Sequence, residues 1–467
     1  MKHNNHHTSF FFADPIQWSA AQWGHAELGD VRRTRRAVKL GAAIAEQSAS
    51  SLPKQTDSWG ELKAAYRLVN EEDVTYEQLS IPHRQATRKQ AEAIPEVILF
   101  VQDTSELNFG SHEALEGRGH IADGSGRGFL MHTCLCILPD ASNPGIIGLA
   151  RQTIWARERI MKRWETLTQR QKRRNEADIW AETLEAIGSA PKGCTWVSVG
   201  DRGSDVFSYV RRARTLGWHC LLRMNANRRI LTKDGSAGKL KEYIRSKPAE
   251  ATKPISVHGR NGKPARTILL QVAWTALTLM PPSNRAEKRE HPQPGWVVRC
   301  WNEAEGLEWI LFSTLPVLTT KDALLGISWY EHRWIIEEYH KCLKTGCAIE
   351  KRQLATTDGL RALFAFLTIT AVRLLQLRSL ARTNPHNPAM ASGIDPLLLT
   401  ITASRLNREL NSLTLAEFWR GVAMVGGFIG RKSDGEPGWQ TLWDGWRRLQ
   451  DMAWGAEWEK AEFQRCG

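Results

Sequence analysis

The stretch YEHRWIIEEYHKCLKTG, at residues 330–346, decides the fold of this 467-residue chain. It holds no proline and closes on a glycine, so the sequence predicts one continuous helix. On a helix that turns about 100° per residue, one narrow face then carries an acid and four other polar groups. These five residues are Tyr330, Arg333, Glu337, Lys344 and Lys341.

A carboxylate ringed by cations and a phenol suits a site that holds a metal ion and a phosphate together. The cations would bind phosphate oxygens, while the carboxylate of Glu337 would bind the ion. The same spacing also fits a structural alternative, because Arg333 and Glu337 stand four residues apart and can pair along a helix. The spacing of this one stretch is compatible with both interpretations.

Upstream of this stretch, the sequence predicts strands that lead into acidic residues. The apolar run before Asp103 is typical of a central strand, and another strand leads into Gly200 and Asp201. Turn-forming residues at 139–144 favour a hairpin between the second and third strands. The predicted strands are 96–103, 132–138, 145–155, 195–199 and 218–223, with helices at 176–187 and 205–216, a glycine-rich loop at 119–128 and a basic loop or exposed helix at 157–174.

The spacing of Tyr330, Arg333, Glu337 and Lys344 resembles the signature of a group of bacterial DDE transposases, the IS-four insertion-sequence family. The resemblance extends over most of the chain and is closest to the Tn-five-like members. The predicted order of strands and helices also matches a ribonuclease-H-like fold. In that fold an acid on the first strand, an acid after the fourth strand and an acid on a later helix come together.

Asp103, Asp201 and Glu337 occupy those three positions. The resemblance implies that they are the catalytic residues and hold two Mg²⁺ ions, for which Mn²⁺ can substitute, and carboxylate oxygens are the ligands that these ions prefer. Taken singly, each aspartate could be a turn residue at the end of a strand. Asp205 and Glu338 are the nearest alternatives for the acidic roles.

The resemblance also assigns DNA-binding roles near these acids. Arg333 and Lys344, with Lys341 beside them, would clamp phosphate near the cleaved end, Tyr330 would donate a hydrogen bond, and Arg223 would contact DNA. One departure from the family pattern is Ser204, where many relatives have an aromatic residue.

The roughly one hundred residues between Arg223 and the signature helix have a different texture. Strands are predicted at 255–257, 266–274, 296–301 and 309–313, which indicates a β subdomain inserted at about 226–315. Trp309 lies 21 residues before Tyr330. At this spacing the Tn-five-like relatives place a Trp that stacks on a flipped base, although Trp309 could also be a core residue.

The region from about Trp18 to Ala93 is predicted to be helical, with Asp30 capping a very basic helix. Its cations are Arg32, Arg33, Arg35, Arg36 and Lys39. Cations packed so densely repel one another unless phosphates neutralise them. The resemblance implies that this region recognises the transposon end, and a solvated basic face is the structural alternative.

Composition supports a nucleic-acid partner. The formal net charge is +13 and the sequence pI is about 9.5, which favours a polyanionic partner. No apolar run reaches membrane-spanning length, and no signal peptide is expected at the polar start. The eight cysteines lack zinc spacing and indicate reduced thiols. We expect a cytoplasmic, nucleoid-associated bacterial protein.

These patterns predict an α/β protein with a ribonuclease-H-like catalytic core of mixed sheet, an inserted β subdomain and flanking helical domains. The expected divisions are a DNA-end recognition domain at 1–92, a catalytic domain at 93–380 and a C-terminal helical domain at 381–467. By resemblance, the last supports dimer contacts in the synaptic complex.

The predicted function is cut-and-paste DNA transposition by two-metal-ion phosphodiester hydrolysis and strand transfer, through a hairpin intermediate. Its partners would be double-stranded DNA, as transposon inverted-repeat ends and target, and a second copy of the chain. A non-catalytic transposase-derived DNA-binding protein and a metal-dependent DNA nuclease are the alternatives. The three acids argue against the first, and the basic N-terminal region and Trp309 argue against the second.

Overall fold

A computed structural model of the chain describes residues 15–122, 124–139, 144–157, 166, 176–257, 266–283, 286–380, 382, 385–392, 394–431 and 434–466. The hairpin turn expected at 139–144 and the basic segment at 157–174 lie mostly outside the described residues. No helix in the described part of the chain is both long and apolar enough to cross a membrane.

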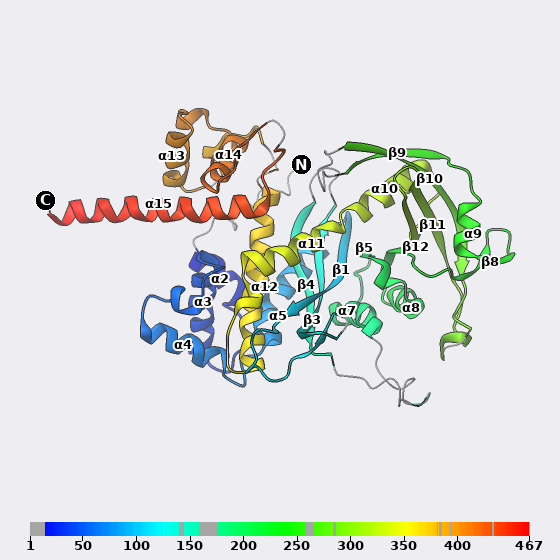
Figure 1. Cartoon of the computed structure of the whole chain (residues 1–467), viewed down its shortest axis with the longest axis horizontal. Coiled ribbons are helices and arrows are strands. Elements are labelled where there is room, and N and C mark those ends of the chain that lie inside the picture. The colour runs from blue at the N-terminus through cyan, green and yellow to red at the C-terminus, as the bar shows by residue number, and fades with distance from the viewer. Residues whose placement is uncertain are drawn as a thin grey trace.

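The N-terminal region consists of helices, as the sequence predicts (Figure 1). Asp30 caps the basic helix, because its side chain accepts a hydrogen bond from the backbone N–H of Arg32. Thr75 forms a capping box with Gln78 at the start of the last of these helices. The helices are α2 (Pro15–Trp23), α3 (Val31–Glu46), α4 (Trp59–Val69) and α5 (Tyr76–Glu92).

A mixed sheet follows, and its first half has the ribonuclease-H-like order. The order across this half is β4-β3-β1-β5-β6, in which β3 is antiparallel to its neighbours β4 and β1, while β5 runs parallel to β1 and β6. The hairpin predicted between β3 and β4 is present. The strands are β1 (Val97–Asn108), β2 (Gly119–Ile121), β3 (Gly126–Leu138), β4 (Gly145–Trp155), β5 (Thr195–Gly200) and β6 (His219–Arg223).

The glycine-rich segment 119–128 is not the loop that the sequence predicts. It forms β2 and the start of β3, which pair with each other in antiparallel register. Gly128 is needed there because a Cβ at this position would collide with the carbonyl oxygen of Leu107 on β1. Close approach between strands, rather than turn formation, explains this glycine.

The strands of the inserted region continue the same sheet. β12 pairs with β6, and β11, β10, β7 and β8 follow outward, with β9 on β10, so that twelve strands in the described part of the chain form one sheet. Helix α9 (Leu240–Arg245) covers part of this extension. The strands are β7 (Arg229–Thr232), β8 (Ala237–Lys239), β9 (Ala251–Val257), β10 (Arg266–Leu279), β11 (Gln293–Asn302) and β12 (Leu307–Ser313).

Hydrophobic cores lie on both faces of the sheet. On one face, Ile98 and Phe100 pack with helices α7 (Ile179–Ile187) and α8 (Phe207–Thr215). On the other face, Leu99 and Val101 pack with the N-terminal helices and with helices that follow the sheet. Alternation along β1 therefore separates the two cores, and the functional side chains of β1 must face one or the other.

The signature stretch is not one helix, and that prediction is wrong. Helix α10 (Thr320–Glu331) ends before His332, α11 (Trp334–Lys341) starts two residues later, and a π-helical segment follows at Cys342–Gly346. α10 packs against β10 and β11, whereas α11 packs against β1 and α12 (Thr357–Leu380). One straight helix could not follow both surfaces, so tertiary packing interrupts the helix although its sequence holds no breaker.

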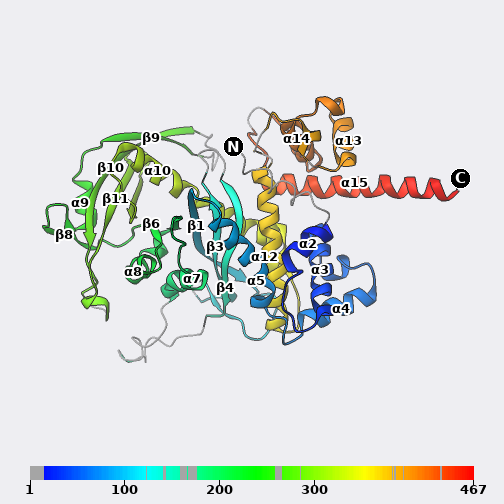
Figure 2. The same ribbon diagram turned by 180° about the vertical axis from the view of Figure 1, so that it is seen from behind.

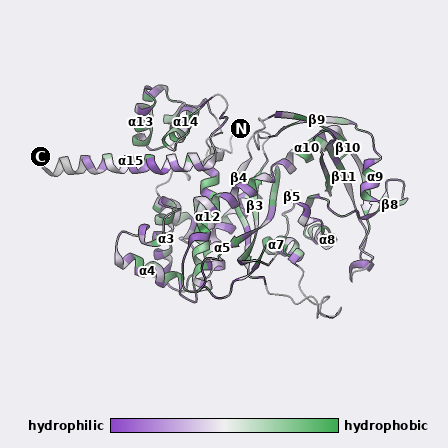
Figure 3. Cartoon of the chain, viewed as in Figure 1, coloured by the Kyte–Doolittle hydropathy of each residue, from purple (hydrophilic) through white to green (hydrophobic). Residues whose placement is uncertain are grey.

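The C-terminal region is helical around the buried helix α12, whose hydrophobic residues run along its length (Figure 3). α12 crosses beside the N-terminal helices, as the view from behind shows (Figure 2). Trp439, Trp443 and Trp446 are buried, whereas Trp454 and Trp458 are exposed on the projecting half of α15. These helices are α13 (Pro396–Arg405), α14 (Leu415–Val425) and α15 (Trp439–Cys466).

Candidate active site

The candidate site begins as one row of residues across the sheet. β1 and β5 pair in parallel up to Val101 and Val199, so Asp103 and Asp201 each stand two residues further along adjacent strands. β5 and β6 pair Val199 with Leu221, which brings Arg223 to the same height. Neighbouring strands lie about 4.8 Å apart, so the register alone brings the two aspartates together, with Asp103 inside β1 and Asp201 directly after the end of β5.

The signature stretch adds its side chains over this row. α11 packs on β1, and Arg333, at the break before α11, donates to Glu337 Oε1 at 2.5 Å and to Asp103 Oδ2 at 3.5 Å. The Arg333 side chain is 15% exposed, against 19% for Asp103 and 35% for Glu337. The salt bridge between Arg333 and Glu337 is therefore present, and Arg333 also bonds Asp103 on β1.

The electrostatics of the site are unbalanced. Burial, the Asp201 charge and the Glu337 charge raise the pKa of Asp103 from 3.8 to about 6, although Arg333 and the Thr104 backbone N–H oppose this rise. Arg333 therefore offsets only part of the rise that burial and the neighbouring carboxylates cause. Such a raised carboxyl pKa is typical of a functional site.

The chemistry of these donors fits hard divalent cations, but the side chains are not yet arranged as a ligand set. Among the described residues, no three His, Cys, Asp or Glu side chains already form a group that could hold a metal ion. The Arg333 guanidinium lies between Asp103 and Glu337 and bonds both. Release of Arg333 from these carboxylates would free their oxygens for an ion.

The two lysines of the signature lie at the edge of this site. Lys344 is in the π-helical segment, with its ammonium 3.7 Å from Glu350, and Lys341 is exposed at the end of α11. Glu350 also accepts a hydrogen bond from the backbone N–H of Asn108 at the end of β1. The sequence patterns gave no reason to single out Glu350, because its position depends on the turn after the π-helical segment.

Trp309 and Tyr330 form an aromatic pair beside the row. Their rings meet edge to face with centroids 5.3 Å apart, and Trp309 is only half-buried. β12 pairs Leu311 with Arg223, so Trp309 projects from the same face as Arg223. Burial raises the pKa of Tyr330, while Arg333 and Arg223 oppose this rise. Tyr330 therefore keeps its phenol proton and can donate it in a hydrogen bond.

The alternative acids have other partners. The Asp205 side chain is 3% exposed, pairs with Arg228 and accepts backbone N–H groups of Asn225 and Ala226 at 2.8 and 2.7 Å. Glu338 accepts from Trp334 Nε1 at 3.3 Å. Neither carboxylate belongs to the row of Asp103 and Asp201.

Ser204 has a clear structural role. It is buried, and its hydroxyl donates to the carbonyl oxygen of Asp201 at 2.6 Å. Asp201 in turn accepts from the backbone N–H of Gly203 at 2.8 Å. Ser204 therefore closes the turn that presents Asp201, a place where the structure leaves little room for a larger side chain, because Gly200 and Trp180 also pack here.

The basic N-terminal helix does not present its cations equally. Arg33 pairs with Glu71 and Asp73, Arg32 pairs with its own capping residue Asp30, and Arg36 lies 4.0 Å from Glu61. Arg35 and Lys39 are exposed and make no ion pair within the described residues. Arg33 is thus partly structural, whereas Arg35 and Lys39 face solvent.

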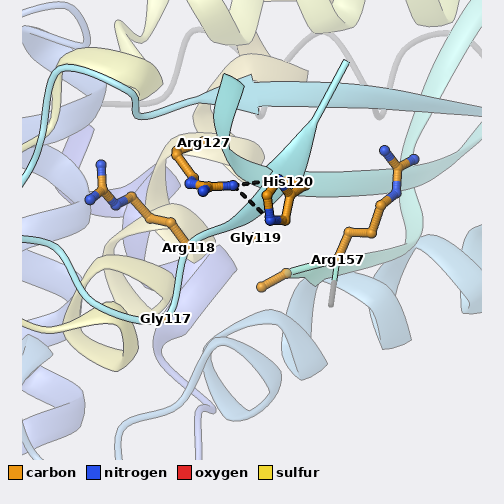
Figure 4. Close-up of a pocket in the computed structure, with 7 residues that line it drawn as sticks. Gly117, Arg118, Gly119, His120, Arg127 and Arg157 are labelled. Carbon is orange, nitrogen blue, oxygen red and sulfur yellow. Dashed lines mark hydrogen bonds between the residues drawn. The ribbon is translucent and has the colours of Figure 1, made fainter. Parts of the chain in front are cut away.

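A separate cavity of about 440 Å³ lies at the β2–β3 hairpin (Figure 4). Arg118, Arg127, Arg157 and His120 line it. Arg118 donates hydrogen bonds to three backbone carbonyl oxygens, and Arg157 donates to the carboxylate of Glu176. These arginines mainly hold the local loop together, so the cavity is not a rival for the row of acids.

The raised pKa of Asp103 gives a testable result. Replacing Asp103 with Asn removes a carboxyl group whose pKa is higher in the folded state than in the unfolded state. Ionisation of such a group destabilises the fold increasingly as the pH rises from about 4 through 6. We expect Asp103→Asn to increase the free energy of unfolding in EDTA at pH 7.5 by up to about 3 kcal/mol, and so to raise the thermal midpoint. Calorimetry measures this shift.

Asp205→Asn is the matched control, since it removes an equally sized group from a paired, buried carboxylate. It should lower the midpoint, because Arg228 would lose its partner. A lower midpoint for Asp103→Asn as well would contradict the charge repulsion described above.

Comparison with known proteins gives matches along most of the chain. Three family models match it in succession: "Transposase DNA-binding" at residues 15–74, "Transposase DDE domain" at 164–373 and "Transposase Tn5 dimerisation domain" at 371–465. The second match includes Asp201 and Glu337 and begins after Asp103.

A solved structure, described as a cryo-EM structure of a piggyBac transposase synaptic complex with hairpin DNA, aligns with 96% of this chain and 83% of that chain. The TM-score is 0.34 and the sequence identity 10%, and we draw no conclusion from that likeness. The three consecutive family matches and the ribonuclease-H-like sheet agree with each other. The chain is a DDE transposase, similar to the Tn5 transposase.

Proposed function

We propose that this transposase performs cut-and-paste transposition, in which it hydrolyses phosphodiester bonds at inverted-repeat ends and joins the released 3′ ends to target DNA. The observation that supports this proposal is the meeting of acids from distant segments, since Arg333 bonds Asp103 and Glu337 and the strand register brings Asp201 beside Asp103. Asp103 and Glu337 are 234 positions apart in the sequence, so no local salt-bridge motif explains their meeting.

The three acids would hold divalent cations, for which Mg²⁺ is the expected species and Mn²⁺ a substitute. Two such ions, when bound, supply activation of the attacking oxygen and neutralisation of the leaving oxygen. The DDE family generally uses divalent ions, and the row of Asp103 and Asp201 provides oxygen donors at a half-buried surface.

Arg333 would change partners during this reaction. In the structure it bonds Glu337 and Asp103, where it offsets part of their charge. If cations compensated the acids, the guanidinium would be available for a phosphate, which it could bind through two parallel hydrogen bonds. Lys344, Lys341 and Arg223 would contact neighbouring phosphates, and Tyr330 would donate its phenol proton.

We further propose the division of labour along the chain. Residues 1–92 would recognise the DNA end, residues 93–380 would carry the chemistry with their insertion at about 226–315, and residues 381–467 would pair two protomers on two ends. The basic α3 helix and the exposed tryptophans of α15 support the first and last assignments. In a bacterial cell such a protein would reside on the nucleoid.

A hairpin intermediate is the route that we propose for release of the element. A hairpin requires a tight bend of the terminal DNA, which one flipped base can relieve. Trp309 is a half-buried aromatic ring beside Tyr330 and Arg223, so one ring face could receive a base while the edge stays packed.

The three acids should act as one unit. Changing any one of Asp103, Asp201 or Glu337 to its amide keeps its size but removes the charge that binds cations. We expect each variant to bind the DNA end with unchanged affinity and to lose cleavage by at least about a thousandfold, on the scale of the barrier changes that charge stabilisation supplies. Gel-shift and cleavage assays measure the two properties.

Asp205→Asn is again the control, and it should cleave. Substantial cleavage by Asp201→Asn in Mg²⁺ would contradict the assignment of the acids. Loss of end binding in all three amide variants would favour a role for these residues in folding.

The exposed cations of α3 should carry binding electrostatically. Each lost phosphate contact should flatten the slope of log affinity against log salt by about 0.9. Changing Arg35 and Lys39 to Ala is expected to reduce the slope by about 2, whereas Arg32→Ala, which breaks a pair with Asp30, should reduce it by about 1 or less. An unchanged slope for the double variant would instead indicate that α3 is a solvated basic face that does not contact phosphates.

Trp309 should matter for the bent state only. Stacking on an aromatic side chain stabilises a base by about 1–3 kcal/mol, or roughly five- to a hundredfold in rate. Trp309→Ala should therefore leave first-strand nicking nearly normal and slow hairpin formation by up to about a hundredfold, and Trp309→Phe should recover most of the loss. Gel time courses with nicked and intact ends measure both steps.

Equal slowing of both steps by Trp309→Ala would identify Trp309 as a packing residue of the core. A lower thermal midpoint for this variant, without any difference between the two steps, would lead to the same conclusion.

A further inference from the structure

The row that contains the catalytic acids does not end at β1. Thr133 on β3 stands directly opposite Asp103, and Gln152 on β4 stands directly opposite Thr133. Directly paired residues project from the same face, so these two side chains share the face of Asp103. Thr133 is 0% exposed and Gln152 is 1% exposed. A buried hydroxyl and a buried amide are costly unless they are hydrogen-bonded, so their partners are informative.

Their hydrogen bonds form a chain that runs from the N-terminal helices to α11. The phenol of Tyr76, the first residue of α5, donates to Gln152 Oε1 at 2.8 Å. Gln152 Nε2 donates to Thr133 Oγ1 at 2.8 Å and to the phenol oxygen of Tyr339 at 3.3 Å. Thr133 Oγ1 lies 3.2 Å from His340 Nε2.

The direction of each bond follows from the donors and acceptors. Tyr76 donates to the amide oxygen of Gln152, and the amide nitrogen of Gln152 faces Thr133 and Tyr339. Thr133 accepts from Gln152, and its own proton can be donated to His340 Nε2 in the tautomer that leaves this nitrogen unprotonated. Burial lowers the pKa of His340 to about 3, so this imidazole is neutral and one ring nitrogen can serve as acceptor.

The far end of the chain is close to the third acid. His340 follows Glu337 by one turn of α11. Tyr339, whose phenol oxygen accepts from Gln152, donates its phenol proton to the carbonyl oxygen of Thr368 on α12 at 3.1 Å. Thr133 is thus the single buried residue that touches α11 and also lies opposite Asp103 in the described structure. Its hydroxyl links α11 to β3 at the position paired with Asp103.

We propose that Thr133 and Gln152 are positioning residues that set the placement of Glu337 relative to Asp103. The proposal rests on the catalytic role proposed for these acids. The row fixes Asp103 and Asp201 through backbone register, but Glu337 comes from a helix and needs side-chain contacts to hold its rotation and height. Tyr76 lies just after the residues that match the DNA-binding family model. The hydrogen bonds from Tyr76 to His340 therefore also attach that region to the site.

The decisive variant is Thr133→Val, which keeps the shape of the side chain but removes both hydrogen bonds. Thr133→Ser keeps the hydroxyl and loses only a methyl group. Thr402→Val is the matched control, since Thr402 is equally buried and its hydroxyl donates to the carbonyl oxygen of Leu398 at 2.8 Å, within the C-terminal helices. Each Val variant loses a buried hydroxyl.

Three measurements separate positioning from general stability: the single-turnover rate of first-strand nicking, the affinity for the DNA end and the hydrogen exchange of residues 334–341. We expect Thr133→Val to slow nicking on the order of ten- to a hundredfold, as for other residues that orient metal ligands. End affinity should stay unchanged, and exchange in 334–341 should become faster. Thr133→Ser should restore both properties, and Thr402→Val should change neither.

Several results would overturn the proposal: a wild-type nicking rate for Thr133→Val, an equal loss in Thr402→Val, or a parallel loss of end affinity and rate. If Thr133→Val does not fold, Tyr76→Phe removes the first bond alone, and it should slow nicking at unchanged end affinity. The amide variants of the acids distinguish this failure from failure of the proposed function. If Asp103→Asn cleaves normally, the acids are not catalytic, whatever Thr133→Val does.

Discussion

The structure of the site depends on one constraint, the parallel register of β1 and β5. This register sets Asp103 and Asp201 at equal heights on neighbouring strands, so two carboxylates must share a half-buried space. Glu337 adds a third charge from α11, and burial with this repulsion raises the pKa of Asp103 to about 6. Arg333 offsets part of that charge, since it bonds acids from two separate elements.

The same row shows why an enzyme of this kind tolerates a long insertion in its middle. β12 returns the chain to β6, so the inserted strands extend the sheet and bring Trp309 beside Arg223. The N-terminal helices reach the site from the other side. Buried Arg352 donates to the carbonyl oxygens of Ser48, Ser50 and Cys347, which ties the end of α3 to the segment that carries Lys344.

Sequence patterns predict the strands of the row well and its helices less well. Apolar runs that end in Asp103 and Asp201 are local features, so both aspartates could be located from the sequence alone. The break at His332 and Arg333 could not, because it holds neither Pro nor Gly and arises where α10 and α11 pack on different strands. Gln152 and Thr133 were missed for a related reason, since isolated polar residues in apolar strands reveal their partners only through the register.

The balance of charge constrains the order in which ligands reach the site. Asp103 and Glu337 share the guanidinium of Arg333, and the ammonium of Lys344 lies beside Glu350. A DNA phosphate that approached this arrangement would meet excess negative charge at a half-buried surface, where water screens poorly. Under the proposed function, cations would therefore bind before the phosphate or together with it. Under the proposed function, Arg333 would then gain a phosphate as partner, and the same side chain that bonds Asp103 and Glu337 would orient DNA.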